Sequence, residues 1–163
     1  MNGCDVAFVG RMKRFTQRYL LFLMLLTGVT LCCCERVSEP RDRREWSIGI
    51  LTGTNLLALS EHPTYRNPRF KSADIPGRVI GSVADPFLMR RDDGWFLFFE
   101  MFDLQKGRGE IGLAASPDGY NWRFVSTVLA EPFHLSYPFV FTDDNEYYMV
   151  PESRAVREVR LYR

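Results

Sequence analysis

The sequence predicts an all-β fold built from a repeated small sheet, and an internal repeat is the main observation behind this prediction. Residues 83–100 (VADPFLMRRDDGWFLFFE) align without a gap with residues 135–152 (LSYPFVFTDDNEYYMVPE), at an offset of 52 positions. Both copies carry aromatic runs on either side of an Asp-rich turn. A period near 50 with strands in each copy is typical of a radial or stacked array of sheets.

The first repeat unit is predicted to form four successive antiparallel strands. An Asp-Asp-Gly turn at 92–94 joins the first two, and a tight Pro-Asp-Gly turn at 117–119 joins the last two. Four such strands make one propeller blade. The strands are expected at about 84–90, 95–101, 110–116 and 121–129.

The second repeat unit is predicted to be an incomplete blade. Its first strand is expected from about residue 135, its turn at 143–146 and its second strand at 147–151. The final run REVRLYR at 157–163 resembles the third strand of the first unit, so a strand is expected there as well.

The residues before the first unit are predicted to form one leading strand and an irregular loop. The run WSIGILTG at 46–53 has the composition of a strand. Residues 54–80 show no clear period and contain His62-Pro63 and Asn67-Pro68, which disfavour regular structure. Propellers close a ring of roughly 4–8 blades, and closure removes exposed sheet edges. We therefore expect residues 46–163 to be a partial propeller of about two blades, as a fragment, a truncated gene product or one part of an assembly.

The N-terminal segment is predicted to be a signal peptide or signal anchor over residues 1–34. Four basic residues precede the apolar run YLLFLMLLTGVTLCCC at 19–34, which we expect to form a hydrophobic helix. The run is somewhat shorter than the roughly 20 residues of a comfortable membrane span. A buried core helix is the alternative, and the cysteines that end the run also suit acylation beside a membrane. The basic residues are Arg11, Lys13, Arg14 and Arg18.

This N-terminal pattern carries an expectation about location. A basic flank stays cytoplasmic, so the residues after the run are expected on the extracytoplasmic or lumenal side, either membrane-anchored through 19–34 or exported. Residues 35–45 are charged and contain Pro40, and they are expected to form a linker.

Composition and motifs exclude several classes of function. The formal net charge of +1 argues against binding of nucleic acid. All four cysteines precede residue 35, so the globular part has no disulfide, thiolate metal site or cysteine nucleophile. Neither His62 nor His134 has a partner at metal-ligand spacing, and phosphate-binding and dinucleotide-binding motifs are absent from the sequence. We therefore expect neither a metal nor a cofactor.

Five strings within residues 46–163 carry a family resemblance. The strings VADPF, DDGWFLFFE, GEIGLAASPDGYNW, EPFHLSYPFVF and EYYMVPE resemble the N-terminal domain of glucosamine inositolphosphorylceramide transferase and its bacterial relatives. That domain is similar to the five-bladed propellers of glycoside hydrolase family 43. The resemblance implies a carbohydrate or glycolipid partner. In the plant transferase it also implies a separate C-terminal transferase domain, which would be a partner together with the missing C-terminal blades.

Asp85 is the first candidate for a catalytic residue. An Asp-Pro pair at the start of an innermost strand faces the central cavity, and the resemblance to the family 43 enzymes implies a general-base role for this Asp. The alternative is that Asp85 only caps the strand through nearby backbone groups. Tyr137 stands at the matching position of the second unit, where those hydrolases keep another Asp, so we expect the chain alone to be inactive in hydrolysis.

Four further residues complete the predicted site. Glu100 and Glu152 end equivalent second strands, where a structural role in binding backbone amides competes with a role at the site. Glu152 is the second catalytic candidate, as an acid or as an acceptor for sugar hydroxyls. The predicted substrate-binding residues are Tyr137, His134 and Glu100.

The sequence thus leaves three functions open. The chain is expected to be the N-terminal propeller portion of a carbohydrate-active protein, associated with glycosyl transfer to a lipid or polysaccharide. The alternatives are a fragment of a glycoside hydrolase of the five-bladed class and a non-catalytic glycan-binding module.

Overall fold

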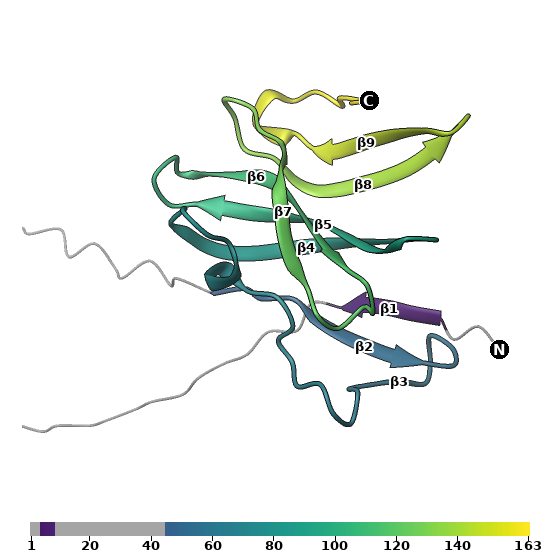
Figure 1. The fold of residues 1–163 in the computed structure, drawn as a ribbon. Coiled ribbons are helices and arrows are strands. Elements are labelled where there is room, and N and C mark those ends of the chain that lie inside the picture. The colour runs from purple at the N-terminus through teal and green to yellow at the C-terminus, as the bar shows by residue number, and fades with distance from the viewer. Residues whose placement is uncertain (1–3, 9–44) are drawn as a thin grey trace, which may run out of the picture.

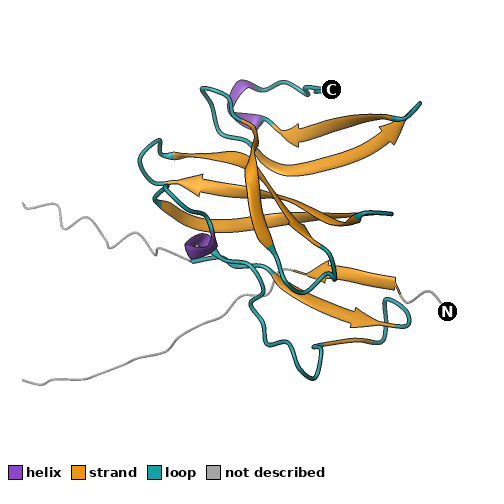
Figure 2. Ribbon diagram, viewed as in Figure 1, coloured by secondary structure: helices purple, strands orange, loops and turns teal. Residues whose placement is uncertain are grey.

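The computed structural model describes residues 4–8 and 45–163, which form three antiparallel sheets. The four-stranded sheet lies between the other two (Figures 1 and 2). The first sheet has the order β1 (Cys4–Phe8), β2 (Gly49–Gly53), β3 (Leu59–Ser60). The all-β prediction is confirmed, and two short 3-10 helices, Ser72–Asp74 and Arg154–Val156, are the only helices in the described part.

The second sheet is the four-stranded unit that the repeat predicts. Its strands pair in chain order as a meander, with the Asp92-Asp93 turn joining the first pair. The turn after the third strand is held by Asp118, whose side chain accepts hydrogen bonds from the backbone N–H groups of Tyr120 and Asn121. The strands are β4 (Ile80–Arg91), β5 (Gly94–Asp103), β6 (Arg108–Ser116) and β7 (Arg123–Leu129).

The third sheet pairs β8 (Ser136–Asp143) with β9 (Glu146–Glu152) and repeats the geometry of β4 and β5. Asp85 in β4 and Tyr137 in β8 both have φ of 48°, and a proline follows each of them. The strand pairing shifts register at both places, between Ala84 and Phe87 and between Ser136 and Phe139. The offset of 52 positions therefore relates two copies of the same kinked inner strand.

Two hydrophobic cores lie on the two faces of the β4–β7 sheet. Alternate residues of β5 point to opposite faces because side chains alternate along a strand. Leu97 and Phe99 belong to the core shared with the first sheet, where the rings of Phe99 and Phe70 lie 4.9 Å apart. Phe98 packs against the other core, which the β4–β7 sheet shares with β8 and β9. Each sheet thus buries its neighbour's face, which fixes the three sheets relative to one another.

Two segments differ from their predicted structure. The strand expected at 157–163 is wrong: only Tyr162 pairs, through an isolated bridge to Met149. A 3-10 turn at Arg154–Val156 ends with Arg157 at φ 57°, and this redirects the chain before it can run along β9. Strand β1 was not expected, because its pairing with β2 spans about 40 residues of intervening chain and leaves no local signal.

The predicted hydrophobic helix at 19–34 lies outside the described residues, as do the linker residues 35–44. Within 4–8 and 45–163, no helix is both long enough and apolar enough to cross a bilayer.

Candidate functional site

The kink in β4 directs Asp85 toward the neighbouring strand. A positive φ at a residue other than glycine is uncommon, and such backbone strain is often found at functional sites. The register shift between Ala84 and Phe87 inserts extra residues into β4, and a bulge of this kind re-aims a side chain. As a result Asp85 forms a hydrogen bond with Glu100 of β5.

Glu100 is a buried carboxyl group with carboxylate neighbours. Its side chain is 14% exposed. Burial, the negative charge of Asp85, the hydrogen bond with Asp85 and the charge of Glu152 together raise the pKa of Glu100 to about 8. At neutral pH Glu100 is therefore a carboxylic acid that donates its proton in a hydrogen bond to the Asp85 carboxylate.

His134 lies on the other side of Glu100. Its Nδ1 accepts a hydrogen bond of 2.8 Å from the backbone N–H of Gly109, and its Nε2 lies 3.5 Å from Glu100 Oε1. Because Nδ1 is an acceptor, the neutral imidazole carries its proton on Nε2, which faces the glutamic acid. The segment that enters β8 thus supplies a polar group to the site on β4 and β5.

Gly109 in β6 makes this close approach possible. A Cβ atom at position 109 would lie 2.7 Å from Glu100 Oε1 and 2.9 Å from His134 Cε1. Sequence reasoning did not identify Gly109 as part of the site, because its neighbourhood has the composition of an ordinary turn. Only the packing of three strands shows why a side chain does not fit there.

Glu152 is held at the equivalent position of the second unit. It accepts hydrogen bonds from Ser136 Oγ at 2.9 Å and from the backbone N–H of Arg154 at 3.0 Å. Ser136 opposes Glu152 in the strand register, as Ala84 opposes Glu100. The structure therefore gives Glu152 a structural role in bonding the backbone, while its charge also reaches Glu100.

Four of the five predicted residues lie together, and we call Asp85, Glu100, His134 and Glu152 the carboxyl cluster. Tyr137 differs from them: its side chain is 67% exposed and makes no hydrogen bond to the described residues. Within 4–8 and 45–163, no three or more His, Cys, Asp or Glu residues are grouped so that they could hold a metal ion.

The separation of the carboxyl groups limits the chemistry of the cluster. Glycosidases place their two carboxyl groups about 5–5.5 Å apart when they retain configuration and about 6.5–9.5 Å apart when they invert it. A hydrogen bond between the side chains of Asp85 and Glu100 is one cause of the raised pKa of Glu100, so these two carboxyl groups are in direct contact. Groups in direct contact are closer together than either of these spacings, so the pair does not match a glycosidase site, but its remaining oxygens can accept hydrogen bonds from a polar ligand.

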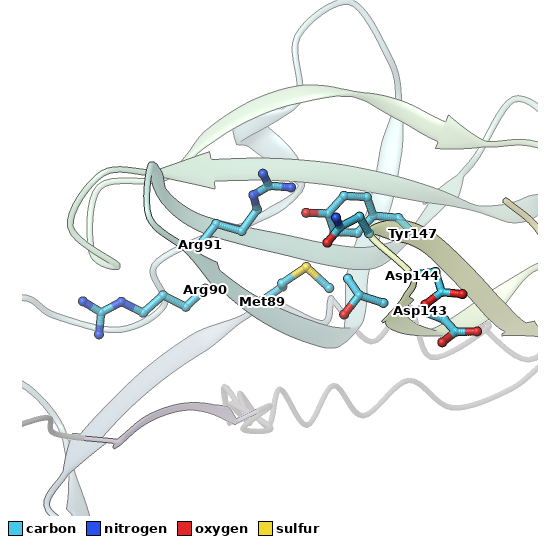
Figure 3. Close-up of a pocket in the computed structure, with 8 residues that line it drawn as sticks. Met89, Arg90, Arg91, Asp143, Asp144 and Tyr147 are labelled. Carbon is cyan, nitrogen blue, oxygen red and sulfur yellow. The ribbon is translucent and has the colours of Figure 1, made fainter.

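A groove of about 680 Å³ lies elsewhere on the molecule (Figure 3). It runs between the β4–β5 and β8–β9 hairpin ends and contains none of the five predicted site residues. Asp85 is six residues away from Arg91 along β4, about 20 Å in an extended strand. The groove and the carboxyl cluster are therefore separate places.

Comparison with known proteins identifies relatives of this chain. A family model described as "Glucosamine inositolphosphorylceramide transferase 1, N-terminal" matches residues 39–163. The transferase 1 of Oryza sativa subsp. japonica is 51% identical over 139 residues, which cover 76% of this chain and 19% of the rice protein. The Arabidopsis thaliana protein of the same name is 35% identical over 133 residues, covering 72% of this chain and 17% of that protein. The chain thus spans about a fifth of the length of these relatives.

Two solved structures of a beta-fructofuranosidase have a similar fold. The Bombyx mori GH32 beta-fructofuranosidase matches with a TM-score of 0.55 and 16% identity, covering 74% of this chain and 27% of that one. A point mutant of the same enzyme in complex with sucrose also gives a TM-score of 0.55, covering 68% of this chain and 23% of the enzyme. At this identity the likeness concerns the fold alone.

Proposed function

Because the chain belongs to the family of N-terminal domains of glucosamine inositolphosphorylceramide transferase, as the match over residues 39–163 shows, we propose that it serves glycosyl transfer by holding a sugar group. In this proposal the three sheets are part of a five-bladed β-propeller. In this proposal the glycosyl group is transferred by another part of the longer protein, and this domain binds the sugar.

The carboxyl cluster is the single observation that carries this proposal. Asp85, Glu100 and Glu152 come from two consecutive repeat units, and the charges of Asp85 and Glu152 both reach Glu100. Together with His134 they offer ionised acceptors, a protonated carboxyl donor and an imidazole N–H. Sugar hydroxyls both donate and accept hydrogen bonds, so a mixed set of this kind suits them.

The names of the relatives supply two candidate ligands. Those proteins are named for glucosamine and for inositolphosphorylceramide. We propose that the cluster binds either the amino sugar or the inositol ring of the glycolipid. The negative charge of Asp85 and Glu152 favours the amino sugar, because its ammonium group is attracted to carboxylates.

The proposal also says on which side of the membrane the domain lies and that the domain does not hydrolyse glycosidic bonds. We propose that residues 19–34 attach the domain to the membrane on its extracytoplasmic or lumenal side, where a glycolipid headgroup is within reach. Hydrolysis by the Asp85–Glu100 pair is disfavoured by the direct hydrogen bond between them. The domain therefore acts as a recognition module in this proposal, and a fragment of a hydrolase is the less supported reading.

The test is a binding measurement on the chain with glucosamine and with myo-inositol as probes, by isothermal titration calorimetry at pH 7. Asp85→Asn removes a negative charge and is expected to weaken binding about tenfold, since a hydrogen bond to a charged group contributes about 1.5–3 kcal/mol. Glu100→Met removes the carboxyl group at this position and is also expected to weaken binding. Arg123→Ala, at an exposed position of β7, is the matched control and keeps the affinity.

Two results would contradict the proposal. One is that neither probe binds to the wild-type chain. The other is that the probes bind but Asp85→Asn and Glu100→Met leave the affinity unchanged, which would place recognition outside the carboxyl cluster.

A further inference from the structure

We propose that the connection between β2 and β3, residues 54–58, is a membrane-contact site that places two neighbouring leucines in the hydrocarbon of a lipid bilayer. Leu56 is 68% exposed and Leu57 is 99% exposed, the highest value for a large hydrophobic side chain in the described part. The connection contains none of the residues of the carboxyl cluster, so this inference goes beyond the proposed function and does not depend on it.

The connection forms a narrow tip at one end of the first sheet. It lies at the far end of β2 and β3, away from the strands of the other two sheets (Figure 1). Gly53, the last residue of β2, pairs with Leu59 of β3. A Cβ atom at position 53 would overlap the carbonyl oxygen of Ala58, so a glycine is needed for the two sides of the hairpin to approach this closely. A slender tip of this kind can enter a fluid lipid layer, which needs no cavity of matching shape.

Asn55 holds the tip in the conformation that presents the leucines. Its Oδ1 accepts a hydrogen bond of 3.0 Å from the backbone N–H of Leu57, and its backbone carbonyl accepts one of 3.1 Å from the N–H of Ala58. Asn side chains commonly stabilise turns through such local bonds. A backbone group without a partner is costly in a bilayer, so these internal bonds lower the cost of burying the tip.

The sequence around the tip has no charged side chain. Residues 46–60, WSIGILTGTNLLALS, contain no Asp, Glu, Lys or Arg, although such residues make up 25% of the chain. A charge in the connection would oppose its entry into hydrocarbon, because moving a charge out of water is costly. The composition of the connection therefore suits contact with lipid tails.

The small size of the apolar surface favours a bilayer over a protein partner. A specific protein interface buries about 800 Å² on each side. The tip offers only Leu56 and Leu57 as large exposed hydrophobic side chains. Lipid tails, in contrast, adapt to a single projecting group, so two leucines are enough to gain from burial there.

The contact is expected to be reversible and shallow. One myristoyl chain gives only marginal, reversible membrane binding, and two leucine side chains contain fewer carbon atoms than that chain. Elements that lie in the membrane interface are buried by about 5–10 Å. The tip therefore determines which end of the first sheet faces the membrane, and it does not anchor the chain.

The experiment is a paramagnetic relaxation measurement by nitrogen-15 NMR on the whole chain, reconstituted in phosphatidylcholine nanodiscs. A nitroxide on the acyl chains of the lipid broadens amide signals close to the hydrocarbon, and we expect it to broaden those of 54–58. Leu57→Ser is expected to weaken insertion of the tip about tenfold and so to remove most of this broadening, because serine lacks the apolar surface. The readout is resolved by residue, so lipid contact of the apolar run at 19–34 does not obscure it.

Leu161→Ser is the matched control, since Leu161 is 61% exposed and lies outside the first sheet. This variant is expected to leave the broadening of 54–58 unchanged. The proposal is overturned if the wild-type signals of 54–58 are not broadened, or if Leu57→Ser is broadened as strongly as wild type. It is also overturned if Leu57→Ser lowers self-association of the chain in sedimentation velocity, because a second copy would then cover the tip.

Discussion

At the scale of single residues, the main feature is that one carboxyl group keeps its proton at neutral pH. Glu100 is enclosed by Asp85, His134 and the backbone of Gly109, and the charge of Glu152 also reaches it. Water has little access to its carboxyl group, so ionisation would place a third negative charge in a confined space. Two chemically identical side chains, Glu100 and Glu152, thus have different environments at equivalent positions.

The raised pKa of Glu100 makes stability depend on pH. In the unfolded chain Glu100 ionises near its ordinary pKa of 4.5, whereas in the folded chain it does so at about 8. Between these values the folded state holds one more proton, so the free energy of unfolding falls as pH rises from about 5 to 8 and levels off above that. Each unit of pKa shift corresponds to about 1.4 kcal/mol.

Glu100→Gln is expected to flatten this decline, measured by urea unfolding from pH 5 to 9. Glu45→Gln, at an exposed position, is the control and should keep the wild-type slope. An unchanged slope in Glu100→Gln would show that another group titrates in this range.

The repeat also predicts how the pKa of Glu100 can be lowered. Ser136 donates to Glu152, but the equivalent Ala84 has no hydroxyl to give to Glu100. Ala84→Ser is expected to place a donor beside Glu100 and to lower its pKa, because a hydrogen bond to the ionised form favours ionisation. The measurement is a carbon-13 NMR titration of the Glu100 carboxyl group, with Ala115→Ser in β6 as the control. A pKa that stays near 8 would mean that the two units differ in backbone position as well as in side chain.

At the scale of elements, a buried ionic network ties the ends of three strands together. Arg78, which precedes β4, donates to Asp103 at the end of β5, to Glu110 at the start of β6 and to Thr127 of β7. Lys106 in the turn between β5 and β6 adds a hydrogen bond of 2.6 Å to Glu110. Burial alone would raise the pKa of Asp103 and of Glu110, but these hydrogen bonds and charges lower both. The network therefore keeps both carboxylates ionised inside the fold.

Arg78→Met is expected to destabilise the chain by about 3–5 kcal/mol, because it leaves buried carboxylates without their partner. The lowered pKa values of Asp103 and Glu110 contribute stability above about pH 4, and that contribution is lost as pH falls. The difference between wild type and Arg78→Met should therefore shrink under acidic conditions. Guanidinium unfolding at pH 7 and at pH 3.5 checks both statements, and Arg123→Met is the exposed control. A small effect at pH 7 would indicate that Lys106 alone suffices for Glu110 and that water reaches Asp103.

The elements differ in how far the sequence could predict them. The β4–β5 and β8–β9 hairpins have local signals, an Asp-rich turn between aromatic runs, and both predictions are confirmed. Strand β1 pairs with a distant partner and has no such signal. The final run at 157–163 has the right pattern for a strand, but the turn at Arg154–Val156 overrides it. Glu100 and Glu152 were found because they end equivalent second strands, and His134 because it flanks an inner strand. Asp85 was found from its Asp-Pro pair at the start of an inner strand, whereas Gly109 is defined only by the side chains that approach it.

At the scale of the whole molecule, one sheet face has no covering layer among the described residues. Phe87 of β4 packs against Phe139 of β8, with ring centres 5.5 Å apart. Phe139 also occupies, in the second repeat unit, the position that Phe87 has in the first. Phe139 is 49% exposed, and the half-buried Phe141 and Tyr148 lie beside it. The β8–β9 sheet thus presents on its outer side the kind of face that the β4–β7 sheet buries.

This face is expected to make the chain self-associate, since contiguous apolar surface of this kind drives contact between molecules. Phe139→Ser is expected to raise the monomer fraction at micromolar concentration, measured by sedimentation velocity. Val159→Ser, at a residue that is 88% exposed outside this sheet, is the control and should have little effect. A wild-type chain that remains monomeric at high concentration would contradict the expectation.

The kinked inner strand has a consequence for how such a protein can change. The backbone adopts the same bend with an acid at position 85 and with a phenol at position 137, so the bend does not depend on the side chain that it displays. The side chain at this position of each unit can therefore change without a change in the backbone. Point substitutions there can give successive units different ligand preferences while the scaffold stays the same.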